Sequence, residues 1–225
     1  LILKQPDLST SIVIVFFILC LIYMAGISYK WIAGALAVAV PSLALVVWLA
    51  KHNMMPFLEP YQINRILAFT NPGKYAELNL QQDNSKMAIG SGRLYGKGLF
   101  NDTAISVKNG NFLSEEHTDF IFSVIGEELG FIGCMIVLLL FLLFVFECLG
   151  MASRARDMAG RLFCTGMAAL VGFQAFTNIA VATGVFPNTG LPLPFISYGV
   201  SSLASLYIGI GILLNVGLQQ RKLEF

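Results

Sequence analysis

Long apolar runs alternate with polar stretches along this chain, and five of the runs are long enough to cross a membrane. A hydrocarbon core about 30 Å thick needs roughly 20 helical residues. The runs cover residues 11–29, 32–50, 131–150, 162–183 and 197–218. The pattern therefore predicts an all-α, polytopic integral membrane protein with about five transmembrane helices in this chain.

The chain divides into three parts. Residues 1–50 hold the first two spans, residues 51–130 form one large polar loop, and residues 131–225 hold the last three spans and a short tail. Within the loop, residues 78–89 carry enough apolar side chains for an amphipathic segment lying on the membrane. The chain starts at Leu1 and not at Met, almost at a membrane entry, so we expect it to be part of a longer protein.

Basic residues in the short connections indicate the orientation, because Lys and Arg gather on the cytoplasmic side of membrane proteins. If the spans alternate, all of these basic groups fall on one face of the membrane. They are Lys30, Arg154, Arg156, Arg161, Arg221 and Lys222. We therefore expect a cytoplasmic C-terminus and an extracellular large loop.

The composition agrees with a membrane protein and argues against several functional classes. Hydrophobic residues make up 56% of the sequence and charged residues 12%, whereas soluble domains carry about a quarter charged residues. The net charge of +1 gives no indication of a nucleic-acid partner. All four cysteines lie in apolar runs, and His52 and His117 are far apart, so neither a disulfide framework nor a metal site is indicated.

The candidate chemistry lies where the large loop meets the third span. On a helical period, five residues share one face and form a small, acidic stripe that descends toward the bilayer. They are Asp119, Ser123, Gly126, Glu127 and Gly130. A helix that starts at Thr118 or Asp119 would enter the membrane without a break. Asp119 could be a helix N-terminal carboxylate or a general base beside a membrane-embedded groove, and both interpretations can hold together.

Arg93 and Lys97 are the candidate cations of the large loop. Lys97 lies between Gly96 and Gly98, which allow the backbone a close approach to a ligand. These cations could hold a phosphate-bearing lipid head group. The alternative is that they serve solubility and extend to the membrane interface.

The remaining polar candidates each have a structural and a functional interpretation, and three of them are candidate substrate-binding residues: His117, Glu127 and Ser197. His117 could handle a proton, although a lone exposed histidine usually does not. Glu127 shares the stripe with Asp119 and could line a polar cavity. Ser197 belongs to a segment whose prolines break any helix, so we interpret residues 190–199 as a packed re-entrant element or a cavity wall. Asn178, in the fourth span, is interpreted as an interhelical hydrogen-bonding group.

Six short motifs follow one another along nearly the whole chain. They are Gln5-Pro6-Asp7-Leu8, Ala88-Ile89-Gly90-Ser91-Gly92, Gly96-Lys97-Gly98, His117-Thr118-Asp119-Phe120-Ile121-Phe122, Gly126-Glu127-Glu128-Leu129-Gly130 and Pro192-Leu193-Pro194-Phe195-Ile196-Ser197-Tyr198-Gly199. In this order they resemble the SEDS family, the RodA, FtsW and SpoVE proteins of bacterial elongation, division and sporulation. The sequences Ile89-Gly90-Ser91-Gly92 and Ser123-Val124-Ile125-Gly126 favour the elongation type.

The resemblance implies a peptidoglycan glycosyltransferase that polymerises lipid II outside the bacterial cytoplasmic membrane. The family's essential aspartate falls on Asp119, which would accept a sugar proton in an inverting displacement of undecaprenyl diphosphate. Lys97, Arg93 or a divalent ion would meet the leaving diphosphate. The family fold would have about ten spans, of which this chain supplies half, so this segment alone is expected to be inactive. The expected partners are lipid II, a class B penicillin-binding protein and membrane lipids.

Two other classes of function stay open at this point. Several spans around a polar cavity would also suit a lipid II flippase or transporter. A non-catalytic scaffold that binds and activates a penicillin-binding protein is the second alternative.

Overall fold

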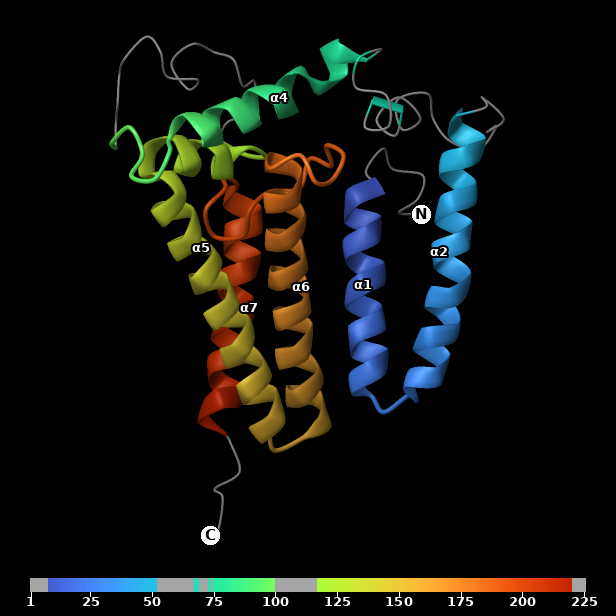
Figure 1. The fold of residues 1–225 in the computed structure, drawn as a ribbon. Helices are drawn as coiled ribbons and strands as arrows, with labels where there is room; N and C mark the ends of the chain where they lie inside the picture. The colour runs from blue at the N-terminus through green and yellow to red at the C-terminus, as the bar shows by residue number, and fades with distance from the viewer. Residues whose placement is uncertain (1–7, 52–66, 69–72, 74, 100–116, 220–225) are drawn as a thin grey trace.

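The structure is a computed structural model, and it describes residues 8–51, 67–68, 73, 75–99 and 117–219. This described part contains helices and connections and no strand, which confirms the expected all-α class (Figure 1). The helices are α1 (Leu8–Met24), α2 (Tyr29–Lys51), α4 (Ala76–Ser91), α5 (Ile121–Arg154), α6 (Met158–Ala182) and α7 (Val200–Leu218).

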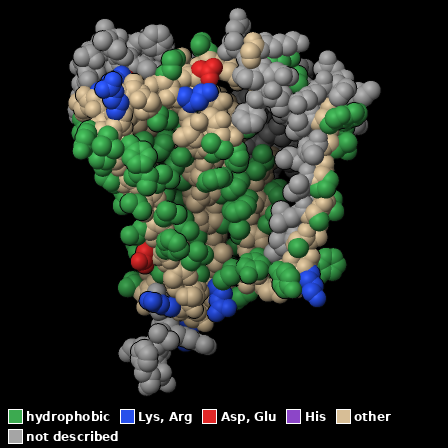
Figure 2. All heavy atoms as spheres, in the orientation of Figure 1, with side chains coloured by type: hydrophobic (Ala, Val, Ile, Leu, Met, Phe, Trp, Pro, Cys, Tyr) green, Lys and Arg blue, Asp and Glu red, His purple; other side chains and the backbone are tan. Residues whose placement is uncertain are grey.

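The helices α1, α2, α5, α6 and α7 run alongside one another, and α4 lies across one end of the bundle (Figure 1). Among the described residues, α5, α6 and α7 are long and apolar enough to cross a membrane, and a shorter apolar helix covers most of α1. Hydrophobic side chains cover the middle of the visible face, and charged side chains gather at its two ends (Figure 2). This surface is the one expected of an integral membrane protein.

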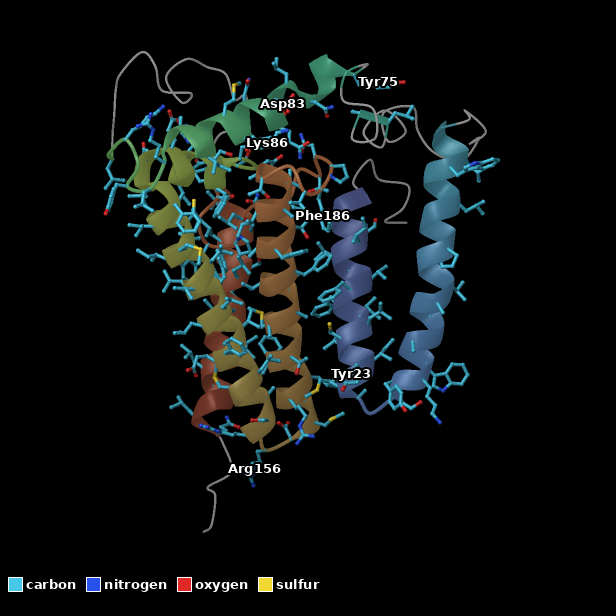
Figure 3. All side chains as sticks on the ribbon, viewed as in Figure 1. Tyr23, Tyr75, Asp83, Lys86, Arg156 and Phe186 are labelled. Atoms are coloured by element: carbon cyan, nitrogen blue, oxygen red, sulfur yellow. The ribbon has the colours of Figure 1, made fainter. Side chains whose placement is uncertain are left out.

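The two ends of the bundle differ in the elements that they carry. Asp83, Lys86 and Phe186 lie at the end covered by α4, whereas Arg156 and Tyr23 lie at the opposite end (Figure 3). The start of α5 is at the α4 end, so the Asp119 motif and the arginine-rich connection are separated by the length of the bundle (Figure 1).

The helix α6 forms the centre of the bundle and packs against α1, α5 and α7. Small buried side chains, such as those of Cys164, Ala168 and Ala175, allow these neighbours to approach closely. Val171 is fully buried in the same helix. Because α6 contacts these three helices, it positions their ends relative to one another at the polar end of the molecule.

The helix α4 turns its polar side chains toward the bundle. Gln82 and Ser85 are buried, whereas Leu80 and Met87 are 58% and 60% exposed. Gln82 donates to the carbonyls of Val181 and Phe186 at 2.8 and 2.6 Å, and Ser85 donates to that of Ala182 at 2.7 Å. The last carbonyls of a helix have no partner within it. The polar face of α4 therefore caps the end of α6.

The helix α5 is broken at Gly130, so the expectation of an unbroken helix is wrong. Gly130 has φ 65° and ψ −163°, whereas the residues on both sides are helical. This combination is open almost only to glycine, because a side chain would collide with its own backbone. The part of α5 before Gly130 therefore forms a separate short helix at the α4 end.

Residues 92–98, which we call the 92–98 segment, satisfy the backbone groups that this break releases. Four backbone hydrogen bonds of 2.8–3.2 Å join the two parts of the chain. The amides of Lys97 and Gly98 donate to the carbonyls of Glu127 and Glu128, and the amides of Phe131 and Ile132 donate to the carbonyls of Arg93 and Leu94. The break and the segment therefore form one structural unit.

This unit predicts a strong effect of Gly130→Ala. A Cβ at Gly130 would meet the amide nitrogen of Gly96 and lie 2.8 Å from the carbonyl carbon and oxygen of Leu94. We expect destabilisation of at least about 1–3 kcal/mol from the backbone strain alone. The measurement is the melting temperature of the purified full-length protein in detergent.

Gly150→Ala, in the same helix, is the matched control. A Cβ at Gly150 would meet nothing within 4 Å, and alanine is favoured over glycine in a helix by about 1 kcal/mol. Its melting temperature should be unchanged or slightly raised. Equal melting temperatures for the two variants would contradict the proposed role of the break.

Candidate active site

Residues 117–120 lead into α5 as a turn, and the helix begins at Ile121, slightly later than expected. Within this turn Phe120 is 1% exposed and packs with Val181 and Phe186. Asp119 is half-buried. The aromatic ring therefore anchors the turn in the protein, and the adjacent carboxylate lies at its boundary with solvent.

Three consecutive carbonyl groups of this turn accept hydrogen bonds from distant parts of the chain. The amide of Tyr198 donates to the carbonyl of His117 at 2.9 Å. The hydroxyl of Ser197 donates to the carbonyl of Thr118 at 2.5 Å. The Nδ2 of Asn178 donates to the carbonyl of Asp119 at 2.7 Å. The backbone that carries the candidate base is therefore held at every residue.

The segment before α7 supplies most of this support. Ser197 is 3% exposed, and its hydroxyl also accepts a hydrogen bond from the amide of Leu193 at 2.7 Å. Gly190, at φ 70°, lies directly beside Asp119, because a Cβ on it would be 3.3 Å from Asp119 Oδ2. The segment contains no helix, as its prolines predict, and it is packed against the start of α5.

A cavity of about 520 Å³ opens beside this turn. His117, Ile121, Ser197 and Tyr198 contribute to its wall. The structure thus brings two of the expected substrate-binding residues, His117 and Ser197, to one cavity. Asp119 belongs to the turn that borders this cavity but is not among its lining residues.

The other expected site residues form a separate group. Lys97 Nζ lies 2.6 Å from Glu127 Oε1, and the two side chains are 22% and 3% exposed. From Ile121 to Glu127 a helix rises about 9 Å, so this ion pair lies farther along α5 than the cavity. Arg93 is exposed, has φ 51°, and supports α5 through its carbonyl.

The acidic stripe is covered by protein. Ser123 is fully buried, and its hydroxyl lies 2.5 Å from that of Ser85 on α4. Gly126 packs against Ile89, also on α4. Glu127 is 2% exposed as a whole residue and lies under the 92–98 segment. Below Asp119 the stripe therefore joins α5 to its neighbours.

Asn178 is the site residue whose place the sequence did not reveal. Its Nδ2 binds the carbonyls of Asp119 and Leu191, both at 2.7 Å, and the residue is 1% exposed. The sequence indicated only an interhelical hydrogen-bonding group. The available signal was an amide within an apolar span, where polar residues are rare and commonly functional.

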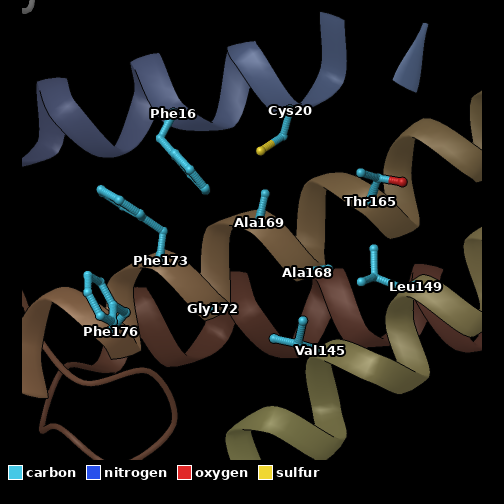
Figure 4. Close-up of a pocket in the computed structure, with 10 residues that line it drawn as sticks. All are labelled: Phe16, Cys20, Val145, Leu149, Thr165, Ala168, Ala169, Gly172, Phe173 and Phe176. Atoms are coloured by element: carbon cyan, nitrogen blue, oxygen red, sulfur yellow. The ribbon is translucent and has the colours of Figure 1, made fainter. Parts of the chain in front are cut away.

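A second, apolar groove of about 460 Å³ lies between α1, α5 and α6 (Figure 4). Phe16 and Phe173 stack across it with ring centroids 4.3 Å apart. No charged side chain belongs to its described lining. The described lining of this groove therefore offers no charged group for acid–base chemistry.

No group of three His, Cys, Asp or Glu side chains gathers in the described part of the chain in a way that could hold a metal ion.

Residues 1–222 match the family model of the cell cycle proteins FtsW, RodA and SpoVE. This chain belongs to that family. The match covers nearly the whole chain and includes the Asp119 turn, the 92–98 segment and the segment before α7. The SEDS resemblance found in the sequence is thereby confirmed.

Curated members of the SEDS family are similar over the whole chain. The chain is 39% identical over 217 residues to a probable peptidoglycan glycosyltransferase FtsW of Trichlorobacter lovleyi, covering 96% of this chain and 54% of the relative. It is 35% identical over 227 residues to the peptidoglycan glycosyltransferase MrdB of Escherichia coli K12, covering 100% and 58%. The chain thus spans about half the length of the curated relatives it matches.

Solved structures of SEDS proteins share the fold. One, from work on polymerization and crosslinking by a peptidoglycan synthase complex, has a TM-score of 0.72 at 30% identity and covers 98% of this chain and 58% of that chain. Another, a mutant of the Thermus thermophilus rod shape determining protein RodA, has a TM-score of 0.60 at 28% identity, covering 97% and 52%. The helical membrane fold of the family is therefore established for this chain.

The buried ion pair predicts an asymmetric effect of its two partners on stability. Lys97→Met leaves the carboxylate of Glu127 buried without its cation, which should cost about 3–5 kcal/mol. Glu127→Gln should cost less, because the Lys97 side chain is 22% exposed and its ammonium can be hydrated. The measurement is the melting temperature of each full-length variant.

The exposed pair on α4 provides the control. Lys86 lies 2.7 Å from Asp83, and the side chains are 48% and 53% exposed. Exposed pairs contribute about 0–1 kcal/mol, so Lys86→Met should barely change the melting temperature. A greater fall in melting temperature for Glu127→Gln than for Lys97→Met would contradict the prediction that the buried carboxylate of Glu127 depends on its cation.

Proposed function

We propose that the full-length protein containing this chain is a peptidoglycan glycosyltransferase that polymerises lipid II, with Asp119 as its general base. The observation that carries the proposal is the half-buried carboxylate of Asp119 on a backbone held at three consecutive carbonyls. The curated relatives bear the name peptidoglycan glycosyltransferase, which supports the same reaction class here.

The proposed step is a single inverting displacement. Asp119 accepts the proton of the 4-hydroxyl of the acceptor's N-acetylglucosamine, and this oxygen attacks the anomeric carbon of the donor's N-acetylmuramic acid. The bond from that carbon to undecaprenyl diphosphate breaks, and the diphosphate leaves with the electron pair. One displacement inverts the sugar, so one base is sufficient and no carboxylate nucleophile is needed.

The surrounding residues divide between binding the sugar and meeting the diphosphate. His117 and Ser197 belong to the cavity beside Asp119, where the sugar would lie. Lys97 already has an anionic partner in Glu127. The exposed Arg93 is therefore the better candidate for charge stabilisation of the leaving group. Glu127 would act indirectly, by holding Lys97.

The location of the basic residues supports an extracellular site. Lys30 at the start of α2, and Arg154, Arg156 and Arg161 around the turn from α5 to α6, belong to the end opposite α4 (Figures 1 and 2). Basic residues in short connections mark the cytoplasmic side, whereas the Lys and Arg of long loops follow this rule poorly. The location of these basic residues supports our proposal that Asp119 lies outside the bacterial cytoplasmic membrane and the C-terminus inside.

A class B penicillin-binding protein is the partner that we propose. One of the solved structures with this fold comes from a synthase complex in which polymerization and crosslinking are coordinated. This chain alone is expected to be inactive, because it spans about half the length of its relatives.

The test is glycan synthesis by the purified full-length protein with lipid II. The wild type should produce polymer, and Asp119→Asn should lower the rate by about 10²–10⁴-fold, the usual contribution of a general base. Asp83→Asn, which removes an exposed carboxylate on α4, should retain the wild-type rate.

Other outcomes would favour the alternative functions. Translocation of lipid II without any polymer would favour a flippase or transporter. Cell-wall growth that tolerates Asp119→Asn but is lost when the last spans are altered would favour a scaffold that activates a penicillin-binding protein. Full polymerase activity in Asp119→Asn would remove the base from the mechanism.

A further inference from the structure

Asn178 is an unusual residue for the interior of a membrane helix bundle. It lies near the end of α6 and is 1% exposed. An amide is costly to bury unless its hydrogen-bonding groups are satisfied. Its side chain must therefore be understood from the partners that it has.

Both hydrogens of the Asn178 amide have partners, and both partners are backbone carbonyls. One is the carbonyl of Asp119 and the other that of Leu191, each at 2.7 Å from Nδ2. A carbonyl can only accept, so these contacts fix which side of the amide carries the nitrogen. The oxygen Oδ1, in contrast, is buried and has no hydrogen-bond partner among the described residues.

The unsatisfied oxygen distinguishes Asn178 from a residue that serves helix packing alone. An apolar side chain of similar size would fill the same space without burying an unpaired acceptor. What such a side chain could not supply is two donors directed at Asp119 and Leu191. The geometry thus points to those two contacts as the use of the amide.

The two carbonyls belong to the two parts of the chain that surround the Asp119 carboxylate, which are the turn before α5 and the segment before α7. One is the carbonyl of Asp119 itself, so it fixes the backbone from which the side chain projects. The other follows Gly190, the residue against which Asp119 Oδ2 lies. One side chain on α6 therefore links the backbone of Asp119 directly to the segment beside it.

We propose that Asn178 is a positioning residue for Asp119, acting on the proposed transfer step without contacting lipid II. This inference rests on the proposed function. The amide holds Asp119 and Leu191 in register, so that the carboxylate faces the acceptor hydroxyl. Loss of the two donors displaces the base and slows the chemical step, because rates are sensitive to displacements of about 1 Å.

The decisive variant is Asn178→Asp in the full-length protein with its penicillin-binding partner and lipid II. This change keeps the shape of the side chain and replaces the two donors by an acceptor. The expected result is a fall in kcat of about tenfold to a hundredfold, with KM for lipid II changed by less than about twofold. Asn178→Ala, which removes the donors without adding a charge, should give a similar fall in kcat.

Thr177→Val is the matched control. Thr177 is the neighbouring residue, is 5% exposed, and its hydroxyl donates within α6 to the carbonyl of Phe173 at 2.7 Å. The variant also replaces a buried polar group in the same turn but leaves Asp119 untouched. It should retain the wild-type kcat and KM.

The outcomes separate this inference from the function on which it rests. Absence of polymer with the wild type, or full activity in Asp119→Asn, overturns both. An active wild type, an inactive Asp119→Asn and a wild-type kcat in a folded Asn178 variant overturn the positioning role alone. An equal fall in Thr177→Val, or failure of both Asn178 variants to fold, assigns Asn178 a structural role and also overturns the inference.

Discussion

Backbone groups that lose their helical partners at the polar end of the bundle are satisfied by other parts of the chain, and this requirement organises the molecule. The end of α6 receives donors from Gln82 and Ser85 of α4. The break in α5 receives the 92–98 segment. The turn before α5 receives donors from α6 and from the segment before α7. Near a membrane, where water cannot always substitute, each of these partners is needed for the adjacent element to end where it does.

The candidate active site follows from the third of these arrangements. An aspartate has a short side chain, so the position of its carboxylate depends mainly on the backbone that carries it. Here that backbone is bound on one side by hydrogen bonds and on the other by the buried ring of Phe120. The protein itself therefore fixes the backbone of Asp119, and a general base held in this way would act without further reorganisation. The cavity lined by His117 and Ser197 opens beside the same turn.

Periodicity and composition were sufficient to predict the helical membrane class and the position of the acidic motif at the start of a long apolar helix, because these depend on local sequence. The packed character of residues 190–199 also followed from local chemistry, since two prolines exclude a helix. The break at Gly130 could not be predicted, because it depends on hydrogen bonds to the 92–98 segment, which is distant in the sequence. For the same reason the partners of Lys97 and Asn178 were missed. Each of these partners is brought close by the tertiary fold, and neither the residue type nor its spacing in the sequence indicates which partner that is.

The contact between α5 and the 92–98 segment has a consequence for sequence change. A side chain added at Gly92 would collide with the carbonyl of Gly126, and one at Gly96 with that of Glu128. In both cases the obstacle is main chain, which no substitution can make smaller. No substitution of a facing side chain can therefore make room for a larger residue at Gly92 or Gly96. Such a residue can be accommodated only if the backbones of the 92–98 segment and of α5 move apart.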